Sequence, residues 1–212
     1  MKVAILGSTG AVGRECLEQA LAAGHEVRVL VRTPSKLPSE LRERVEVVEG
    51  DALNVGDVEK LLAGGIEAVL FAIGVDKYSP EDLCTDVTLH LLTTMPKKGV
   101  RRLVWCGGGS TIVKEDHVTF GARFVAVFAS MFMGLRHRDK EHQYELLESN
   151  REIEWLGVRP LQLKKGERSG VYRTGFDAFN GLSSLTFADC ADAMLKMLSD
   201  DTWLYKAPIV QY

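Results

Sequence analysis

The chain has 212 residues, of which 46% are hydrophobic and 26% charged, so it can bury a large core and is neither disordered nor a coiled coil. Its net charge of −3, from 26 basic and 29 acidic residues, gives no electrostatic reason to expect a nucleic acid as partner. The longest apolar stretch, residues 124–135, is shorter than the roughly 20 residues that cross a bilayer, so no membrane span is expected.

Short apolar segments alternate with helical ones along the chain. We predict strands at residues 2–7, 26–31, 44–49, 68–72, 103–106 and 152–159, and an edge strand at 207–210. We predict helices at residues 10–23, 54–63, 82–98, 119–149 and 190–198. This alternation predicts one α/β domain over residues 1–212, with three layers and a doubly wound parallel sheet. Residues 110–150 and 160–185 are expected as substrate-side additions.

Four residues indicate where the predicted helices begin or end. Gly24 is expected as the C-cap of the first helix, because glycine tolerates the left-handed conformation found there. Asn54 and Thr186 are expected as N-caps, because their side-chain oxygens can accept hydrogen bonds from the first turn. Pro96 is expected to end or distort the third helix.

The turn between the first strand and the first helix contains three glycines, in the order Gly7-Ser8-Thr9-Gly10-Ala11-Val12-Gly13. Small residues allow the backbone to approach a pyrophosphate, and the helix N-terminus presents unpaired N–H groups to the anion. The spacing is Gly-x-x-Gly-x-x-Gly rather than the common Gly-x-Gly-x-x-Gly. The alternative is a tight turn that needs glycine only for packing. The position of the glycine motif at the first β–α turn favours a dinucleotide site.

The end of the second strand carries Arg32, followed by Lys36, and the next carboxylate is Glu40. Enzymes that prefer NAD place an Asp or Glu here to bind the ribose 2′-hydroxyl. A guanidinium and an ammonium group suit a 2′-phosphate instead, so the sequence predicts NADP(H). The alternative is that both are solvated loop charges.

Asp51 and the segment 72–74 follow the third and fourth strands. In an open α/β sheet, ligands lie beyond the carboxyl ends of the strands. Asp51 could accept a hydrogen bond from the adenine amino group, or it could be a turn residue. The segment could pass along the ribose and pyrophosphate.

The remaining reactive side chains form no recognisable metal or disulfide pattern. Cysteines 16, 84, 106 and 190 are widely spaced, which favours buried thiols in a reducing cytoplasm. His137 and His142 are five residues apart, which does not fit a helical metal pair, so no metal is expected. Either could relay a proton, because histidine titrates near neutral pH.

Taken together, these motifs resemble the atypical short-chain dehydrogenase/reductases, in particular the NAD(P)H-binding, NmrA-like group that includes biliverdin-IXβ reductase/flavin reductase. The matching segments are residues 7–13, 31–37, 50–52, 99–104, 138–143, 154–160 and 187–193, so the resemblance covers nearly the whole chain. It implies an NAD(P)-binding Rossmann fold and a cytoplasmic oxidoreductase.

The cofactor contacts expected from the motifs and this resemblance follow the sheet edge. They are Gly7, Ser8, Thr9, Gly10, Ala11, Val12 and Gly13 at the pyrophosphate, Arg32 and Lys36 at the 2′-phosphate, Asp51 and Ala52 at adenine, and Ala72, Ile73 and Gly74 along the ribose. Cys106, Gly107 and Pro160 complete the set, with the Arg159–Pro160 junction at the nicotinamide end.

The chain departs from typical members in its catalytic residues. It has no Tyr-x-x-x-Lys pair, since Tyr144 is followed four residues later by Glu148, and Ser110 is the first hydroxyl after the fifth strand. The candidate catalytic residues are therefore Ser110, His137 and His142. Flavin reductase-like members can work without the pair, because hydride transfer between two apposed rings needs chiefly proximity.

The sequence leaves more than one function open. The first is an NADPH-dependent oxidoreductase that acts on a flavin-, quinone- or tetrapyrrole-like acceptor. The second is a non-catalytic NADP(H)-sensing protein that binds a regulatory partner, which the missing pair favours. A sugar-nucleotide epimerase or dehydratase is disfavoured, because it would keep the pair and need a larger substrate region. The apolar segment 124–133 could be core, a wall for a small planar apolar substrate, or a homo-oligomer interface.

Overall fold

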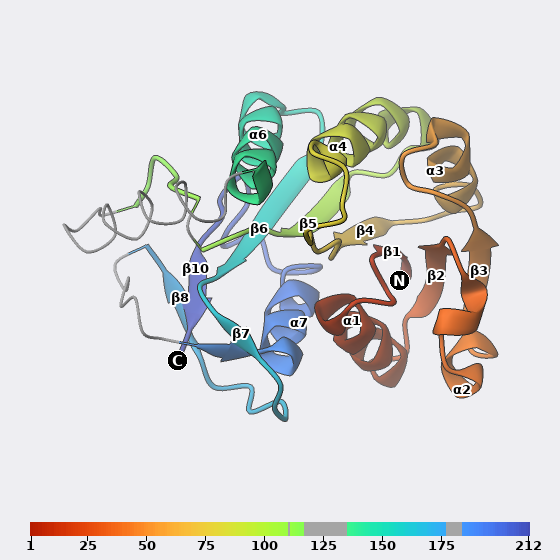
Figure 1. The fold of residues 1–212 in the computed structure, drawn as a ribbon, viewed down its shortest axis with the longest axis horizontal. Coiled ribbons are helices and arrows are strands. Elements are labelled where there is room, and N and C mark those ends of the chain that lie inside the picture. Colours follow the sequence, from red (N-terminus) through yellow and green to blue (C-terminus); the bar gives the residue numbers. More distant parts are fainter. Residues whose placement is uncertain (110, 117–134, 177–183) are drawn as a thin grey trace.

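The computed structural model describes residues 1–109, 111–116, 135–176 and 184–212, built around an eight-stranded sheet (Figure 1). The strand order is β3-β2-β1-β4-β5-β6-β10-β8. All neighbouring strands run parallel except β10 and β8, which are antiparallel. The strands of this sheet are β1 (Lys2–Leu6), β2 (Glu26–Val31), β3 (Glu46–Glu49), β4 (Ala68–Phe71), β5 (Arg102–Cys106), β6 (Glu154–Pro160), β8 (Arg173–Gly175) and β10 (Ile209–Gln211).

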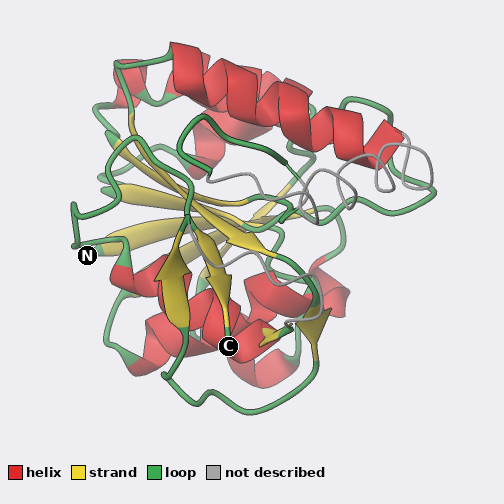
Figure 2. Cartoon of the chain, turned by 90° about the vertical axis from the view of Figure 1, so that its left-hand side faces the viewer, coloured by secondary structure: helices red, strands yellow, loops and turns green. Residues whose placement is uncertain are grey.

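Helices cover both faces of the sheet, which makes three layers (Figure 2). One face carries α1 (Ala11–Ala22) and α7 (Phe187–Lys196), and the other carries α3 (Val55–Leu61), α4 (Leu83–Thr94) and α6 (Leu135–Ser149). The shorter elements are η1 (Pro34–Lys36), α2 (Ser39–Arg42), η2 (Pro96–Lys98), and a small parallel pair of β7 (Leu163–Lys164) with β9 (Leu185–Thr186). The predicted three-layer, doubly wound α/β fold is confirmed.

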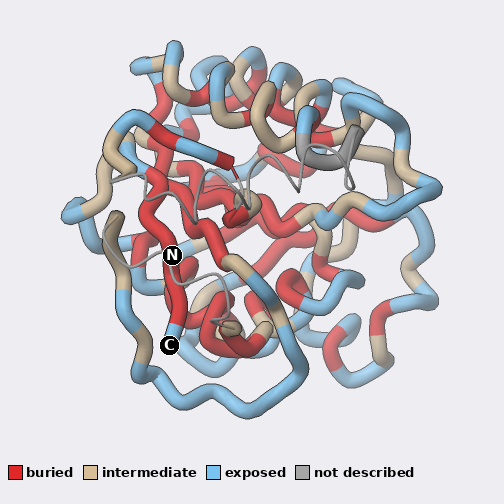
Figure 3. The backbone as a smooth tube through the Cα atoms, turned by 60° about the vertical axis from the view of Figure 1, so that its left-hand side comes forward, coloured by how far each residue is buried: buried red, intermediate tan, exposed pale blue. Residues whose placement is uncertain are grey.

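The core is split by the sheet into two apolar clusters, one beneath each helical layer. Strand residues alternate between them: Val3 and Ile5 face α1 and α7, whereas Ala4 and Leu6 face α3 and α4. Burial on both faces explains why the central strands are almost wholly apolar. Figure 3 shows the buried residues along the strands and the inner sides of the helices.

The chain reverses direction across the sheet between β1 and β4. From β1 it moves outward to β2 and β3, then returns to β4 on the other side of β1. Leu6 therefore pairs with Leu30 on one side and with Phe71 on the other. This is the topological switch point, where open α/β sheets leave a crevice beyond the strand ends.

The predicted N-caps Asn54 and Thr186 are confirmed by their hydrogen bonds. Asn54 Oδ1 accepts from Gly56 N at 2.9 Å, and Thr186 Oγ1 accepts from Asp189 N at 3.0 Å. The C-cap of α1 is Ala23 rather than the predicted Gly24, which is the next residue and takes the expected left-handed conformation with φ +79°. Helix α4 ends at Thr94, two residues before Pro96 begins η2.

The predicted edge strand at residues 207–210 is wrong in its position. The observed strand β10 lies inside the sheet, between β6 and β8. The edge is β8, a polar three-residue segment whose sequence carries no strand signal and which is held by antiparallel pairing to β10. The last helix also begins at Phe187 rather than residue 190, because the Thr186 cap fixes its first turn.

Two predicted features fall partly or wholly outside the described residues. Of the long helix expected at 119–149, the structure describes α6, which crosses over from β5 to β6 and packs against α4. The apolar segment 124–133 lies outside the described residues. Within the described ranges, no helix combines the length and apolar character needed to cross a bilayer.

Candidate cofactor site

The glycine turn is shaped by close backbone contacts at the switch point. Gly7 has φ +86°, and a Cβ there would lie 2.6 Å from the carbonyl carbon and oxygen of Ala72. A Cβ on Gly13 would lie 2.1 Å from the Gly7 oxygen. The first glycine therefore lets the turn pass against the end of β4, and the third lets α1 pack against the turn.

The N-terminus of α1 has no side-chain cap. Its N-cap is Gly10, which has no side chain and therefore no side-chain oxygen to cap the helix, and the first turn contains no acidic residue. The buried Ser8 Oγ has no hydrogen-bond partner in the part of the chain that the structure describes. Free N–H groups and the positive end of the helix dipole are suited to an anionic group such as a pyrophosphate.

A cavity of about 190 Å³ opens next to this turn. Its wall comes from the carboxyl ends of β1, β2, β3 and β4 and from the start of α4. Eight of the predicted contacts line it: Gly7, Thr9, Gly10, Arg32, Asp51, Ala52, Ile73 and Gly74. Of the other predicted contacts, Ser8, Ala11, Val12 and Gly13 belong to the turn and the first turn of α1, and Ala72 follows β4.

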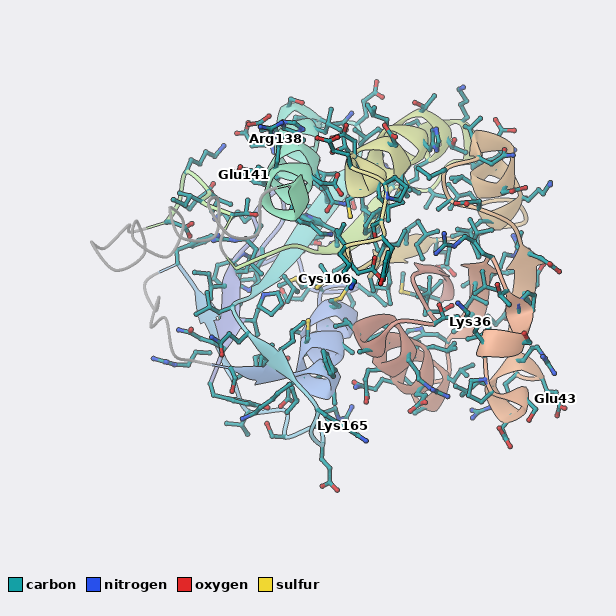
Figure 4. The ribbon with its side chains drawn as sticks, viewed as in Figure 1. Lys36, Glu43, Cys106, Arg138, Glu141 and Lys165 are labelled. Carbon is teal, nitrogen blue, oxygen red and sulfur yellow. The ribbon has the colours of Figure 1, made fainter. Side chains whose placement is uncertain are left out.

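The two predicted phosphate-binding cations differ in their relation to the cavity. Arg32 is exposed and lines it, whereas Lys36 is exposed on η1, on the α1 side of the sheet, and does not (Figure 4). Neither forms an ion pair with another described residue. Asp51 lines the cavity, and its Oδ1 accepts from Leu53 N at 3.0 Å as a turn residue would, so a hydrogen bond to adenine stays a prediction.

The ends of β5 and β6 form the far side of the same sheet edge. Gly107 N donates to Val158 O, and Gly109 N donates to Pro160 O, each at 2.9 Å. The Arg159 side chain is fully buried and is bound to Asp116 and to backbone carbonyls, so its guanidinium group is used within the protein. The predicted contacts Cys106, Gly107 and Pro160 are not among the residues that line the cavity.

The sequence prediction missed Lys140, which lies on α6 at the ends of β4 and β5. Its Nζ donates to Cys106 O at 3.1 Å, to Ile73 O at 3.3 Å and to Gln143 Oε1 at 3.0 Å. The half-buried ammonium group therefore stands between the cavity and the end of β5. The sequence does indicate this region, because the segment 138–143 is one of those that match the family, but the match gave Lys140 no role.

The chain also matches a known protein family. The NAD(P)H-binding family matches residues 7–201. The chain belongs to this family. The resemblance predicted from the sequence is thereby confirmed, and the glycine turn and cavity lie inside the matched region.

Three proteins similar to this chain match it over nearly its whole length. The Bacillus subtilis protein YwnB is 26% identical over 206 residues, covering 93% of this chain and 92% of YwnB. ChuY, an anaerobilin reductase from Escherichia coli O157:H7, has a TM-score of 0.81 at 17% identity, with 99% and 96% of the two chains covered. A wide-type short-chain dehydrogenase/reductase from Veillonella parvula, in complex with NADP, has a TM-score of 0.78 at 17% identity, with 100% and 94% covered. These solved structures share the Rossmann-like fold.

Of the three candidate catalytic residues of this NAD(P)H-binding protein, the structure describes the side chain of His142. Ser110 and the side chain of His137 lie outside the described residues. His142 does not line the cavity, and its Nδ1 lies 3.8 Å from Asp82 Oδ1 at the start of α4. Within the described ranges, no cluster of His, Cys, Asp and Glu side chains could hold a metal ion.

Asp139 fixes the helix that carries Lys140. Its buried carboxylate accepts from Cys84 N and Thr85 N, each at 2.9 Å, and from Thr85 Oγ1 at 2.8 Å. It therefore caps the N-terminus of α4 from another helix, where negative charge is favoured.

We expect Asp139→Asn to lower the free energy of unfolding by about 2 kcal/mol, because the amide loses the charge and one acceptor. Equilibrium denaturation measures this loss. Glu145→Gln, an exposed change on the same helix, is the control and should have little effect. Equal stability of the Asp139 variant and the wild type would contradict the capping role.

Proposed function

We propose that the protein is an NADPH-dependent oxidoreductase that transfers hydride to a flat, apolar acceptor of flavin, quinone or tetrapyrrole type. The observation that carries the cofactor choice is Arg32, a cation on the cavity wall at the end of β2, where an NAD-preferring site would have a carboxylate. A planar guanidinium group binds a phosphate by two parallel hydrogen bonds, which suits the 2′-phosphate of NADP(H).

The residues of the chain supply binding and electrostatics. The uncapped turn at residues 7–13 would hold the pyrophosphate, and Arg32 would hold the 2′-phosphate. NADPH, when bound, supplies the hydride. The Lys140 ammonium group, fixed between the ends of β4 and β5, adds positive charge at the far end of the cofactor path. Its role is binding and positioning, because Arg136, not a tyrosine, precedes it by four residues.

A proton for the acceptor would come from solvent, since no described acid lines the cavity apart from Asp51, which is bonded to Leu53 N. Such a reaction requires mainly that two rings be held against each other. ChuY, a reductase with the same fold, supports this choice of reaction class.

The cofactor is tested by thermal shift with NADPH, NADH, NADP⁺ and NAD⁺, since a ligand stabilises a protein according to its concentration relative to Kd. We expect NADPH to stabilise the wild type most. Arg32→Asp should weaken NADPH binding by about 1–3 kcal/mol, because a charge-assisted hydrogen bond is lost. Arg42→Asp, the same charge change at an exposed position outside the cavity, is the control. An NADPH preference that survives Arg32→Asp would contradict the proposal.

The reaction is tested by following loss of NADPH absorbance with FMN, riboflavin and quinones. Turnover with at least one acceptor is expected. Tight NADPH binding without turnover on a broad panel would favour the second candidate, a non-catalytic NADP(H) sensor. The absence of a Tyr-x-x-x-Lys pair from the sequence supports that candidate. A partner whose capture depends on the NADP⁺/NADPH ratio would establish it.

A further inference from the structure

Three of the four cysteines lie on the same side of the sheet, in the apolar cluster beneath α1 and α7. Cys106 ends β5, Cys190 is in the first turn of α7, and Cys16 is in α1. The Sγ atoms of Cys106 and Cys190 are 3.9 Å apart. Figure 4 shows Cys106 between β5 and α7, at the centre of the molecule. Cys16 contacts Met194 Sδ at 3.9 Å instead.

The surroundings of the two close thiols make them chemically unequal. A hydrogen bond from Cys190 lowers the pKa of Cys106, against the effect of burial, and the nearby Lys140 charge lowers it further. The same bond and burial raise the pKa of Cys190. Because the thiolate is the reactive form, these directions favour Cys106 as the nucleophile, with Cys190 as the thiol that then reacts with the oxidised Cys106.

Access also favours Cys106 as the first to react. It keeps 9% of its surface exposed, whereas Cys16 and Cys190 are fully buried. Its carbonyl oxygen accepts from Lys140, so it lies at the sheet edge that the cofactor cavity shares. Of the two cysteines, Cys106 is therefore the one with surface open to a small oxidant.

We propose that Cys106 and Cys190 form a reversible dithiol–disulfide pair that a peroxide oxidises. The Cys106 thiolate attacks one oxygen of hydrogen peroxide, the O–O bond breaks, and a sulfenic acid and water result. The Cys190 sulfur then attacks the sulfenic sulfur, the S–S bond forms, and a second water leaves. The two thiol protons end in the two waters, and peroxide takes up both electrons. A thiol reductant reverses the reaction.

The disulfide would also change the cofactor site, an effect that rests on the proposed function. Bond formation draws the end of β5 toward α7, and with it the Cys106 carbonyl that holds Lys140. The oxidised protein is therefore expected to bind NADPH several-fold more weakly than the reduced protein.

The disulfide itself is tested without any nucleotide. The reduced full-length protein is treated with hydrogen peroxide, the remaining thiols are alkylated, and the peptides are mapped under non-reducing conditions. We expect the free thiols to fall from four to two, with one linked peptide that joins Cys106 to Cys190 and disappears after reduction. Peroxide treatment that leaves these two cysteines unlinked overturns the proposal, as does a link from either to Cys16 or Cys84.

Two variants show whether the order of events is right. In Cys190→Ser, the sulfenic acid at Cys106 should persist and react with dimedone, whereas the wild type should give little adduct. Cys84→Ser is the matched control: Cys84 is buried and influenced by Lys140, but no other described sulfur is its partner, so the Cys106–Cys190 link should form unchanged. No dimedone adduct on Cys106 in Cys190→Ser would overturn the order.

NADPH titration of both redox forms separates the two proposals. Weaker binding by the oxidised form supports the coupling, and equal binding overturns it. If the reduced protein fails to bind NADPH, the proposed function fails while the peptide map still decides the disulfide.

Discussion

Gly13→Ala is expected to destabilise the fold by about 3 kcal/mol, because the new methyl group would be forced into the backbone of the glycine turn. Its Cβ would lie 2.1 Å from the Gly7 oxygen and 2.6 Å from the Gly7 carbonyl carbon. Neither atom can rotate away, so either α1 or the end of β1 must shift. Equilibrium denaturation measures the loss, and thermal shift with NADPH should show little or no added stabilisation, because the turn that would hold the pyrophosphate has moved.

Gly10→Ala is the matched control within the same turn. A Cβ at Gly10 would meet one atom, the Gly7 oxygen, at 3.3 Å, which a small shift can relieve. Stability should therefore change much less than in the Gly13 variant, although both substitutions replace glycine by alanine. If the two variants lose equal stability, close packing of α1 on the turn is not the reason for the third glycine.

Features whose signal is local in the sequence could be predicted. The strand-to-helix turn at residues 7–13 needs glycine for reasons that involve its immediate neighbours, so its composition indicated its place. Asn54 and Thr186 accept hydrogen bonds from residues two and three positions later, which the capping pattern already implies. The alternation of these local units was enough to predict the layers and the sheet edge at which the cavity opens.

Features that depend on contacts between residues far apart in the sequence could not be predicted. Asp139 caps α4 from 55 residues away, so the sequence around the start of α4 gives no sign of it. Lys140 acquires its place only when α6 packs beside the ends of β4 and β5. The position of β10 inside the sheet depends on pairing with β8, a segment without strand character. In each case tertiary contacts decide the role of a residue whose local signal is weak.

The pair of Arg159 and Asp116 is another contact between residues far apart in the sequence. The Arg159 side chain is fully buried and Asp116 keeps 10% of its side chain exposed, with Nη1 donating to Asp116 Oδ2 at 2.9 Å. Arg159 also donates to Thr111 O and Ala207 O, so it ties the segment after β5 to the one before β10. We expect Asp116→Ala to cost about 3–5 kcal/mol in equilibrium denaturation, because a buried guanidinium is left without its counter-charge.

A double variant shows whether the loss of stability comes from the unpaired buried charge or from the loss of contacts. Asp116→Leu combined with Arg159→Met removes both charges, so it should recover much of the stability lost in Asp116→Ala. Lys114→Ala tests the same segment, since Lys114 pairs with Glu148 at 2.7 Å but both are substantially exposed, and it should change stability little. If the double variant is as unstable as Asp116→Ala, the charge is not the cause, and the loss comes from the segment itself. Recovery would mean that the loss in Asp116→Ala comes from the uncompensated Arg159 guanidinium, and that the pair itself adds little net stability.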